Sequence, residues 1–196
     1  MIEIYDDVFD SITQNHIENF VLDNNASWSF NAQTCTPGYK KHFAIEESPQ
    51  IVRAFKSDGV DVEPFNFQPF EKFLKGKYFY RCKSNILFQK KFGWFEEKRK
   101  VNMPHVDLYY SHVVMLYYVN ESDGDTVIYK EKYNGNGEAK YPSQLTELKR
   151  IKPKKGRLVV FDGLHYHASS NPRKNPYRCV INFDLIGMHN SHINLN

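Results

Sequence analysis

Apolar residues recur with two different periods along the chain, and the period changes near Lys77. Before that point they stand at helical spacing, as Ile12, Ile17, Phe20 and Val21 do, which is the pattern of an amphipathic helix. Together with the turn residues between the segments, this pattern predicts three helices. We expect them at residues 11–23, 49–56 and 64–74.

From Lys77 onward the period shortens to two, and the segments become rich in Val, Ile, Tyr and Phe, which is typical of strands. Clusters of Asn, Asp and Gly separate these segments and favour turns. Helices followed by many short strands predict an α+β chain that is mainly β and is built on an antiparallel sandwich or barrel. The predicted strands cover residues 78–88, 105–110, 112–119, 126–129, 157–161 and 177–185.

Length and composition support one folded domain. The chain has 196 residues, of which 41% are hydrophobic and 15% aromatic, which suffices for a core and excludes wholesale disorder. No apolar run approaches the roughly 18 residues that span a membrane, and the acidic start MIEIYDDVFD lacks the features of a signal peptide. Cys35, Cys82 and Cys179 are odd in number and widely spaced, so we expect neither a disulfide framework nor a zinc site. A reduced, cytoplasmic location is therefore expected.

Positive charge is concentrated in two runs, although the net charge of +3 is too small to indicate nucleic-acid binding by itself. Two interpretations are open. The runs can be solvated loops beside strands, which we favour, or they can form a basic rim that attracts an anionic substrate. The runs comprise Lys90, Lys91, Lys98, Arg99 and Lys100, and then Lys149, Arg150, Lys152, Lys154, Lys155 and Arg157.

Two histidines and one aspartate form a candidate metal site. His105 and Asp107 are two positions apart in a predicted strand, so their side chains should share one face. Two imidazoles and one carboxylate make up the facial triad of non-haem Fe(II) oxygenases. The second imidazole can come from His165 or His167, and we favour His167 from its spacing to Arg178. The His-x-Asp pair is a weak signal by itself, because the chain has eight histidines.

Arg178 follows His167 by eleven positions and supplies a planar guanidinium that can grip a carboxylate in bidentate fashion. A short, turn-like segment separates the two residues, so a reversal of the chain can bring Arg178 beside the metal. The histidines, the aspartate and the arginine together indicate an iron site with a binding site for a keto acid beside it.

Four segments between residues 81 and 185 carry a resemblance to a known family. They read HVDLYY, VVMLYYVNESDGDTVIY, KPKKGRLVVFDGLHYHASSNP and YRCVINFDL. In combination they resemble the 2-oxoglutarate- and Fe(II)-dependent dioxygenases, close to the prolyl 4-hydroxylase-like branch. Residues 1–75 match that family only loosely.

The resemblance implies a double-stranded β-helix, which is a cupin-like jelly roll, with N-terminal supporting helices and the site at its mouth. We expect a single dioxygenase domain over residues 1–196. Within it, the expected divisions are helical support at 1–75, the jelly-roll core at 76–188 and a polar tail at 189–196.

By position, the resemblance assigns His105, Asp107 and His167 as the catalytic residues and Fe(II) ligands. It assigns Arg178 as the partner of the C5 carboxylate of 2-oxoglutarate. Dioxygen is the other cosubstrate, and ascorbate is a further candidate cofactor. A second contact to 2-oxoglutarate is expected from a neighbouring strand, and its candidates are Asn85 and Tyr117, with Tyr80 and Asn182 behind them.

The expected reaction is hydroxylation of a C–H bond, coupled to decarboxylation of 2-oxoglutarate to succinate. We expect a peptidyl proline or an amino acid as substrate, no membrane partner, and a substrate rim formed by residues 89–104 and 130–155. Two alternatives stay open. One is an oxidative demethylase of nucleic acid, for which Phe92, Trp94 and Phe95 could stack bases. The other is a non-catalytic, cupin-like binding module.

Overall fold

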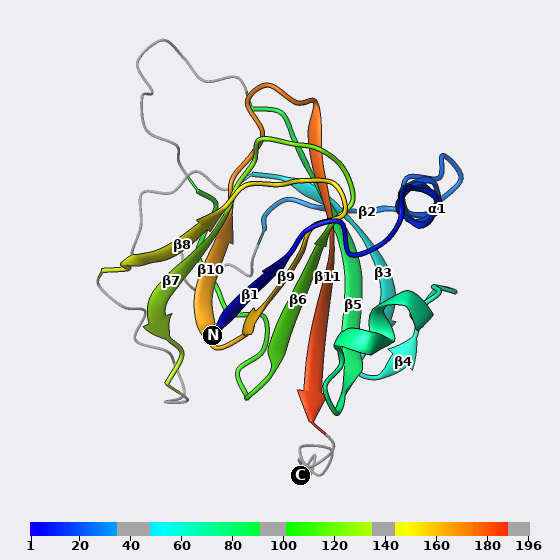
Figure 1. The fold of residues 1–196 in the computed structure, drawn as a ribbon. Helices are drawn as coiled ribbons and strands as arrows, with labels where there is room; N and C mark the ends of the chain where they lie inside the picture. The colour runs from blue at the N-terminus through cyan, green and yellow to red at the C-terminus, as the bar shows by residue number, and fades with distance from the viewer. Residues whose placement is uncertain (35–47, 91–100, 135–143, 188–196) are drawn as a thin grey trace.

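The strands form two antiparallel sheets in the computed structural model, which describes residues 1–34, 48–90, 101–134 and 144–187 (Figure 1). The larger sheet runs in the order β1 (Ile2–Tyr5), β9 (Leu158–Asp162), β6 (Val113–Tyr118), β11 (Tyr177–Gly187), β5 (Lys77–Phe88), β3 (Gln50–Ser57) and β2 (Ser29–Asn31), and β4 (Val60–Asp61) pairs with β3. The smaller sheet runs in the order β10 (His165–Ser169), β7 (Thr126–Lys132) and β8 (Glu147–Ile151).

Both faces of the larger sheet are buried, and the alternation along β11 divides its side chains between two clusters. Val180 belongs to an inner cluster that also contains Ile128 and Ile151 of the smaller sheet. Ile181 and Phe183 belong to an outer cluster on the opposite face. The outer-face residues of β11 are apolar, whereas its other face carries three buried polar residues, Arg178, Asn182 and Asp184.

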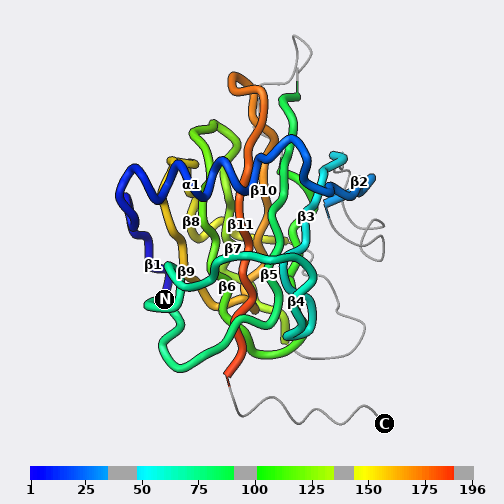
Figure 2. The backbone as a smooth tube through the Cα atoms, turned by 90° about the vertical axis from the view of Figure 1, so that its right-hand side faces the viewer, coloured from blue at the N-terminus to red at the C-terminus, as the bar shows by residue number. Residues whose placement is uncertain are grey.

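The outer face is covered by the helix α1 (Ser11–Val21) and by a 3₁₀ helix, Gln68–Phe73, which cross in front of the strands in Figure 2. Asp10 caps α1, because its side chain accepts a hydrogen bond from the backbone N–H of Thr13 at 2.8 Å. Phe70 projects from the 3₁₀ helix onto Phe183, with 4.7 Å between the ring centroids. This cover leaves the inner face to form the site.

Three of the predicted elements are corrected by the structure. Residues 49–56 were expected to be helical, but Gln50–Ser57 is strand β3, because its β-branched residues pair with β5. The helix expected at 64–74 is the shorter 3₁₀ helix, whose period of three matches the spacing of its phenylalanines. The strand expected at 105–110 is reduced to a single bridge at His105.

The expected division at residue 75 is also corrected, because β1 and β3 lie within the larger sheet and residues 1–75 are therefore not only helical support. Strands β8 and β10 were not predicted. The tail at 189–196 lies outside the described residues. Within the described residues, no helix is long and apolar enough to cross a membrane.

The predicted fold class is confirmed: the protein is mainly β, with two facing antiparallel sheets in the manner of a jelly roll. The inner cluster fills only part of the space between these sheets. The remainder is a cavity lined by residues of β5, β6, β7, β10 and β11.

Candidate metal centre and carboxylate site

A single β-bridge brings the first two candidate ligands together. The backbone N–H of His105 donates to the carbonyl of His167, and the N–H of His167 donates to the carbonyl of His105, both at 2.9 Å. The two imidazole centroids are consequently 4.8 Å apart. The predicted pairing of these residues therefore arises from a long-range bridge, since the segment around His105 is otherwise irregular.

Backbone carbonyls set the tautomer of both imidazoles. The Nδ1 atom of His105 is 3.0 Å from the carbonyl of Met103, and the Nδ1 atom of His167 is 3.1 Å from the carbonyl of His165. A carbonyl can only accept, so Nδ1 carries the hydrogen in both rings, and Nε2 is the nitrogen that would bind a metal. A metal-binding histidine is oriented in the same way, with its second nitrogen donating to a carbonyl.

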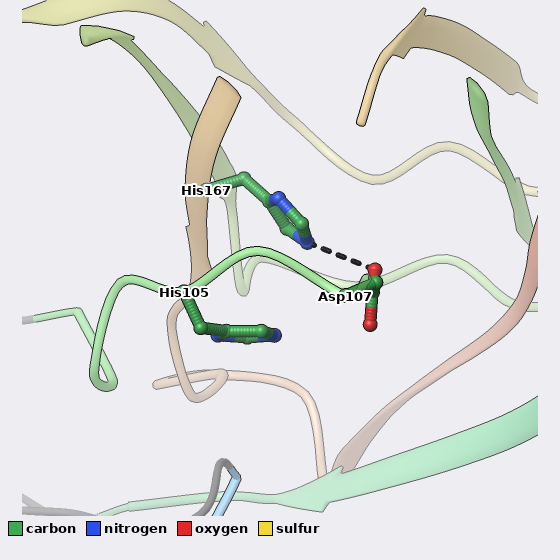
Figure 3. Close-up of side chains that lie close together, drawn as sticks. All are labelled: His105, Asp107 and His167. Atoms are coloured by element: carbon green, nitrogen blue, oxygen red, sulfur yellow. Dashed lines mark ion pairs between the residues drawn. The ribbon is translucent and has the colours of Figure 1, made fainter. Parts of the chain in front are cut away.

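Asp107 completes the cluster (Figure 3). Its Oδ2 atom is 3.2 Å from Nε2 of His167, and the ligand atoms of His105, Asp107 and His167 all lie within 4.8 Å of one another. Figure 3 shows the three side chains converging on one point from two separate backbone segments. Two imidazole nitrogens and one carboxylate oxygen suit a divalent first-row metal with open coordination positions, so the residues present fit the iron that the facial-triad pattern implies.

His165, the alternative to His167, lies elsewhere. Its Nδ1 atom is 2.8 Å from the carbonyl of Tyr129, and it does not line the cavity. The pairing of β10 with β7 shifts register between His165 and His167, so the two side chains do not share the simple alternation of a regular strand.

The buried charges of the cluster shift one another's pKa values. Burial and the neighbouring His167 lower the pKa of His105 to about 4. Burial acts to lower the pKa of His167, but its hydrogen bond to Asp107 and the charge of that carboxylate raise it overall. Burial acts to raise the pKa of Asp107, but His167 and the charge of Arg81 hold it well below its ordinary value. Asp107 is therefore ionised, as a metal ligand must be.

Arg81 holds the Asp107 carboxylate in place and is itself paired with Asp184. A terminal nitrogen of Arg81 donates to Oδ1 of Asp107 at 2.7 Å, and Nε of Arg81 donates to Oδ2 of Asp184 at 2.5 Å. Asn182 donates to the other oxygen of Asp107, Oδ2, at 3.1 Å. Burial and the charge of Asp107 raise the pKa of Asp184, which is fully buried. These contacts leave Oδ2 as the oxygen that faces His167.

Neither Arg81 nor Asp184 was predicted from the sequence. A usable signal existed for Asp184, because it shares the two-residue period of Arg178 and Asn182 on β11. No comparable signal pointed to Arg81, whose partners are 26 and 103 positions away in the chain.

Arg178 lies in the same cavity and is only 3% exposed. It donates to Oγ1 of Thr126 at 2.7 Å, and its guanidinium lies 5.5 Å from the ring centroid of Tyr118. Its Nε atom is buried without a hydrogen-bond partner, and no carboxylate of the described residues forms an ion pair with it. A buried guanidinium without an anion is costly, so the site is suited to an anionic ligand.

Gly124 allows the chain to pass close to Arg178. A Cβ atom at this position would lie 2.4 Å from the carbonyl oxygen of Ser170 and 3.0 Å from Cδ of Arg178. A side chain at position 124 would therefore displace either the backbone or the guanidinium. Close packing therefore explains why a glycine stands two positions before Thr126, the first residue of β7.

The two candidates for a second 2-oxoglutarate contact lie in different places. Asn85 lines the cavity, and its Oδ1 atom is buried without a partner. Tyr117 does not line the cavity, because it points into the outer cluster and packs against Phe70. Its neighbour Tyr118 points inward instead. Tyr117 is therefore not a contact for 2-oxoglutarate, and its assignment is corrected. Adjacent residues of a strand point to opposite faces, so only one of Tyr117 and Tyr118 can face the cavity.

Tyr118 and Thr126 are the residues that surround Arg178 in place of Tyr117. The hydroxyl of Tyr118 donates to Oγ1 of Thr126 at 2.6 Å. Asn182, another candidate, contacts Asp107 as described, whereas Tyr80 is not among the residues that line the cavity. Of the expected substrate rim, residues 91–100 and 135–143 lie outside the described residues, and residues 147–151 form strand β8.

Comparison with known proteins supports the fold. No protein-family model and no curated protein matches the sequence. Solved structures match over nearly the whole chain. An oxidoreductase of the 2OG-Fe(II) oxygenase family from Burkholderia pseudomallei has a TM-score of 0.62 at 11% identity, with 94% of this chain and 84% of that chain covered.

Two further structures connect the fold to 2-oxoglutarate. A viral collagen prolyl hydroxylase from Paramecium Bursaria Chlorella virus-1, in a 2OG complex, has a TM-score of 0.51 at 13% identity, with 95% of this chain and 96% of that chain covered. The non-heme alpha-ketoglutarate-dependent epimerase SnoN from nogalamycin biosynthesis has a TM-score of 0.60 at 8% identity, with 95% and 78% covered. The resemblance to the 2-oxoglutarate- and Fe(II)-dependent oxygenases is thus confirmed at the level of the fold.

Proposed function

We propose that this protein is an Fe(II)- and 2-oxoglutarate-dependent oxygenase. One observation carries the proposal: a buried arginine that pairs with no carboxylate of the described residues shares a cavity with a His-Asp-His cluster. A metal site alone is compatible with many chemistries, and a buried cation alone is compatible with many anions. The two together fit a ligand that chelates a metal at one end and carries a carboxylate at the other.

His105, Asp107 and His167 would hold Fe(II) and leave three coordination positions open. The iron, when bound, supplies activation of dioxygen coupled to oxidative decarboxylation of 2-oxoglutarate to succinate. The chain's own task is to hold the ligands in one geometry. The carbonyls of Met103 and His165 fix the imidazole tautomers, and Arg81 fixes the carboxylate.

Arg178 would bind the C5 carboxylate of 2-oxoglutarate, with Thr126 beside it. Oγ1 of Thr126 accepts from both Arg178 and Tyr118, so its own hydrogen is free to donate to that carboxylate. Asn85 remains a candidate for a further contact, because its side chain lines the cavity and its amide nitrogen can donate to a carboxylate. The apolar side chains of Val114 and Leu116 line the same cavity and would exclude water from it.

The proposed reaction is hydroxylation of a C–H bond in an amino acid or a peptidyl proline. The viral collagen prolyl hydroxylase and the epimerase SnoN show that this fold is used with more than one kind of substrate. A non-catalytic module has no evident use for Arg178 without an anion. The aromatic residues that suggested a nucleic-acid demethylase lie outside the described residues. A cytoplasmic location and ascorbate as reductant remain predictions. Two of the cysteines, Cys82 and Cys179, are free and buried.

The proposal is tested by succinate formation. The purified protein should convert 2-oxoglutarate to succinate when Fe(II), ascorbate and dioxygen are supplied, at a slow uncoupled rate even without substrate. Asp107→Ala should abolish this activity and the binding of Mn(II), measured by electron paramagnetic resonance, because the cluster loses its only charged ligand. Asp162→Asn is the matched control, since this carboxylate lies outside the cluster, where it pairs with Lys132 and accepts from the backbone N–H of Leu164. Wild-type protein that binds Mn(II) but never 2-oxoglutarate would overturn the proposal.

A further inference from the structure

Lys83 is a second cation in the cavity that has no described partner. It lies on β5, two positions after Arg81, and its side chain lines the cavity together with His105 and Asp107. Arg81 forms ion pairs with two carboxylates. Lys83, by contrast, forms no hydrogen bond or ion pair with any residue that the structure describes. Burial lowers the pKa of its ammonium, and the charge of Asp107 only partly opposes this.

Strand register places Lys83 away from Arg178. On the β5–β11 ladder, Lys83 pairs with Asn182, whereas Arg178 pairs with Leu87. The two residue pairs are four positions apart along the strands, which corresponds to roughly 13 Å between their backbones. Asn182 contacts Asp107, so Lys83 lies at the metal end of the cavity. Lys83 and Arg178 therefore start from different levels of the cavity wall, and Lys83 is the one nearer the metal ligands.

The charges of the cavity do not balance without another anion. Arg81 is matched by the buried Asp184, and Asp107 is matched by part of the charge of a divalent metal. Lys83 and Arg178 add a positive charge each. A 2-oxoglutarate dianion would neutralise all but one of the positive charges that remain. A buried charge that stays unpaired is costly, so the loaded cavity favours one more negative group.

The neighbouring inward residues are polar as well. Asn85, the next residue of β5 on this face, lines the cavity and has a buried Oδ1 atom without a partner. Gln50 of strand β3 lines the same wall and is 4% exposed. The amide nitrogen of Gln50 is already used by the carbonyls of Gln33 and Thr34. A cation beside the unpaired amide oxygen of Asn85 therefore suits a ligand that carries both a carboxylate and a donor such as an ammonium.

We infer that Lys83 binds a carboxylate of the primary substrate, which is therefore a small organic acid such as a free amino acid. The inference rests on the proposed function and narrows its substrate. Both carboxylates of 2-oxoglutarate already have partners in that scheme, one at the metal and one at Arg178. Lys83 is thus a specificity residue, and a peptidyl substrate without a free carboxylate nearby would leave its charge unpaired.

The experiment compares Lys83→Met with the wild-type protein, because methionine keeps most of the side-chain length and removes the charge. Lys149→Met is the matched control, since Lys149 is exposed on β8. Each protein is loaded with Mn(II) and 2-oxoglutarate, which does not turn over with this metal. Calorimetric titrations then follow with free L-amino acids and with the corresponding amino-acid amides.

We expect the wild-type complex to bind at least one free amino acid at least tenfold more tightly than its amide. Lys83→Met should lose this preference, while the affinities for Mn(II) and 2-oxoglutarate stay within about twofold. Lys149→Met should behave as wild type. The ligand-free Lys83→Met protein should also melt at the same or a higher temperature, because it no longer holds an unpaired, partly buried cation in the cavity wall.

Three results would overturn the inference. The first is binding of acids and amides with equal affinity, or of neither, by the wild-type complex. The second is a selective loss of 2-oxoglutarate affinity in Lys83→Met, which would make Lys83 a cosubstrate residue. The third is a lowered melting temperature of Lys83→Met without ligand, which would show a structural role. Failure of the wild-type protein to bind 2-oxoglutarate at all would instead reject the proposed function.

Discussion

The positive charges of this protein fall into two groups that behave differently. In the basic run 149–157, most of the cations have a carboxylate partner on the outside of the molecule. Arg157 pairs with Asp6 at 2.6 Å, Lys154 with Asp7 at 2.7 Å and Lys155 with Glu18 at 2.5 Å. In the cavity, Lys83 and Arg178 have no carboxylate partner among the described residues.

The cations of the run 149–157 stabilise the fold through ion pairs, whereas the cations of the cavity are available to a ligand. The run 149–157 was conspicuous in the sequence, and the interpretation as solvated strand flanks suits the structure better than a basic rim. Its cations tie residues 152–157 to the N-terminal segment and α1. The cavity cations Lys83 and Arg178 were less conspicuous in the sequence, yet no carboxylate of the described residues forms an ion pair with them.

The largest effect is expected at Arg81, which contacts the cavity residue Asp107 but, like the surface cations, is paired with carboxylates. Arg81→Met would leave Asp184 buried without a partner and release Oδ1 of Asp107. We expect the free energy of unfolding to fall by about 3 kcal/mol, and Mn(II) to bind more weakly. Urea unfolding and Mn(II) titration measure the two effects. Unchanged Mn(II) affinity would show that Asn182 alone orients the carboxylate.

The next effect concerns the unpaired arginine. Arg178→Ala should weaken 2-oxoglutarate binding to the Mn(II)-loaded protein by about 2 kcal/mol, because the ligand carboxylate loses a buried, charged partner. Arg178→Lys should restore only part of this affinity, since an ammonium lacks the planar fork of a guanidinium. Calorimetry gives both values. Affinity that survives in Arg178→Ala would assign the carboxylate to another cation of the cavity.

The smallest effect is expected at the surface. Lys154→Ala and Arg157→Ala should each change the free energy of unfolding by less than about 1 kcal/mol, because exposed ion pairs are screened by water and salt. Neither variant should alter the affinity for Mn(II) or 2-oxoglutarate. Denaturation and calorimetry at low and high salt provide the check. Weaker 2-oxoglutarate binding in either variant at low salt would revive the basic rim.

The local pattern of apolar residues was sufficient to predict some of the strands but not others. Segments with a clear period of two, such as β5 and β11, were predicted within one or two residues, because alternation and β-branched residues report directly on a pleated, half-buried surface. The pattern failed for β3, where Pro49 and spaced apolar residues also suit a helix. Pairing with β5 decided that segment, and no local feature encodes a neighbour 30 positions away.

The sequence by itself determined the fold class and the chemical identity of the candidate ligands, because a His-x-Asp pair, a later histidine and an arginine restrict the chemistry through residue type and order alone. Tertiary structure decided which of the charged groups are paired with one another and which are available to a ligand. The bridge between His105 and His167, the inward face of Tyr118 and the pairing of Arg81 with Asp184 all depend on contacts across strands. An isolated Lys83 and a paired Lys154 look alike in the chain, since whether a lysine has a carboxylate beside it is settled only when distant strands pack together.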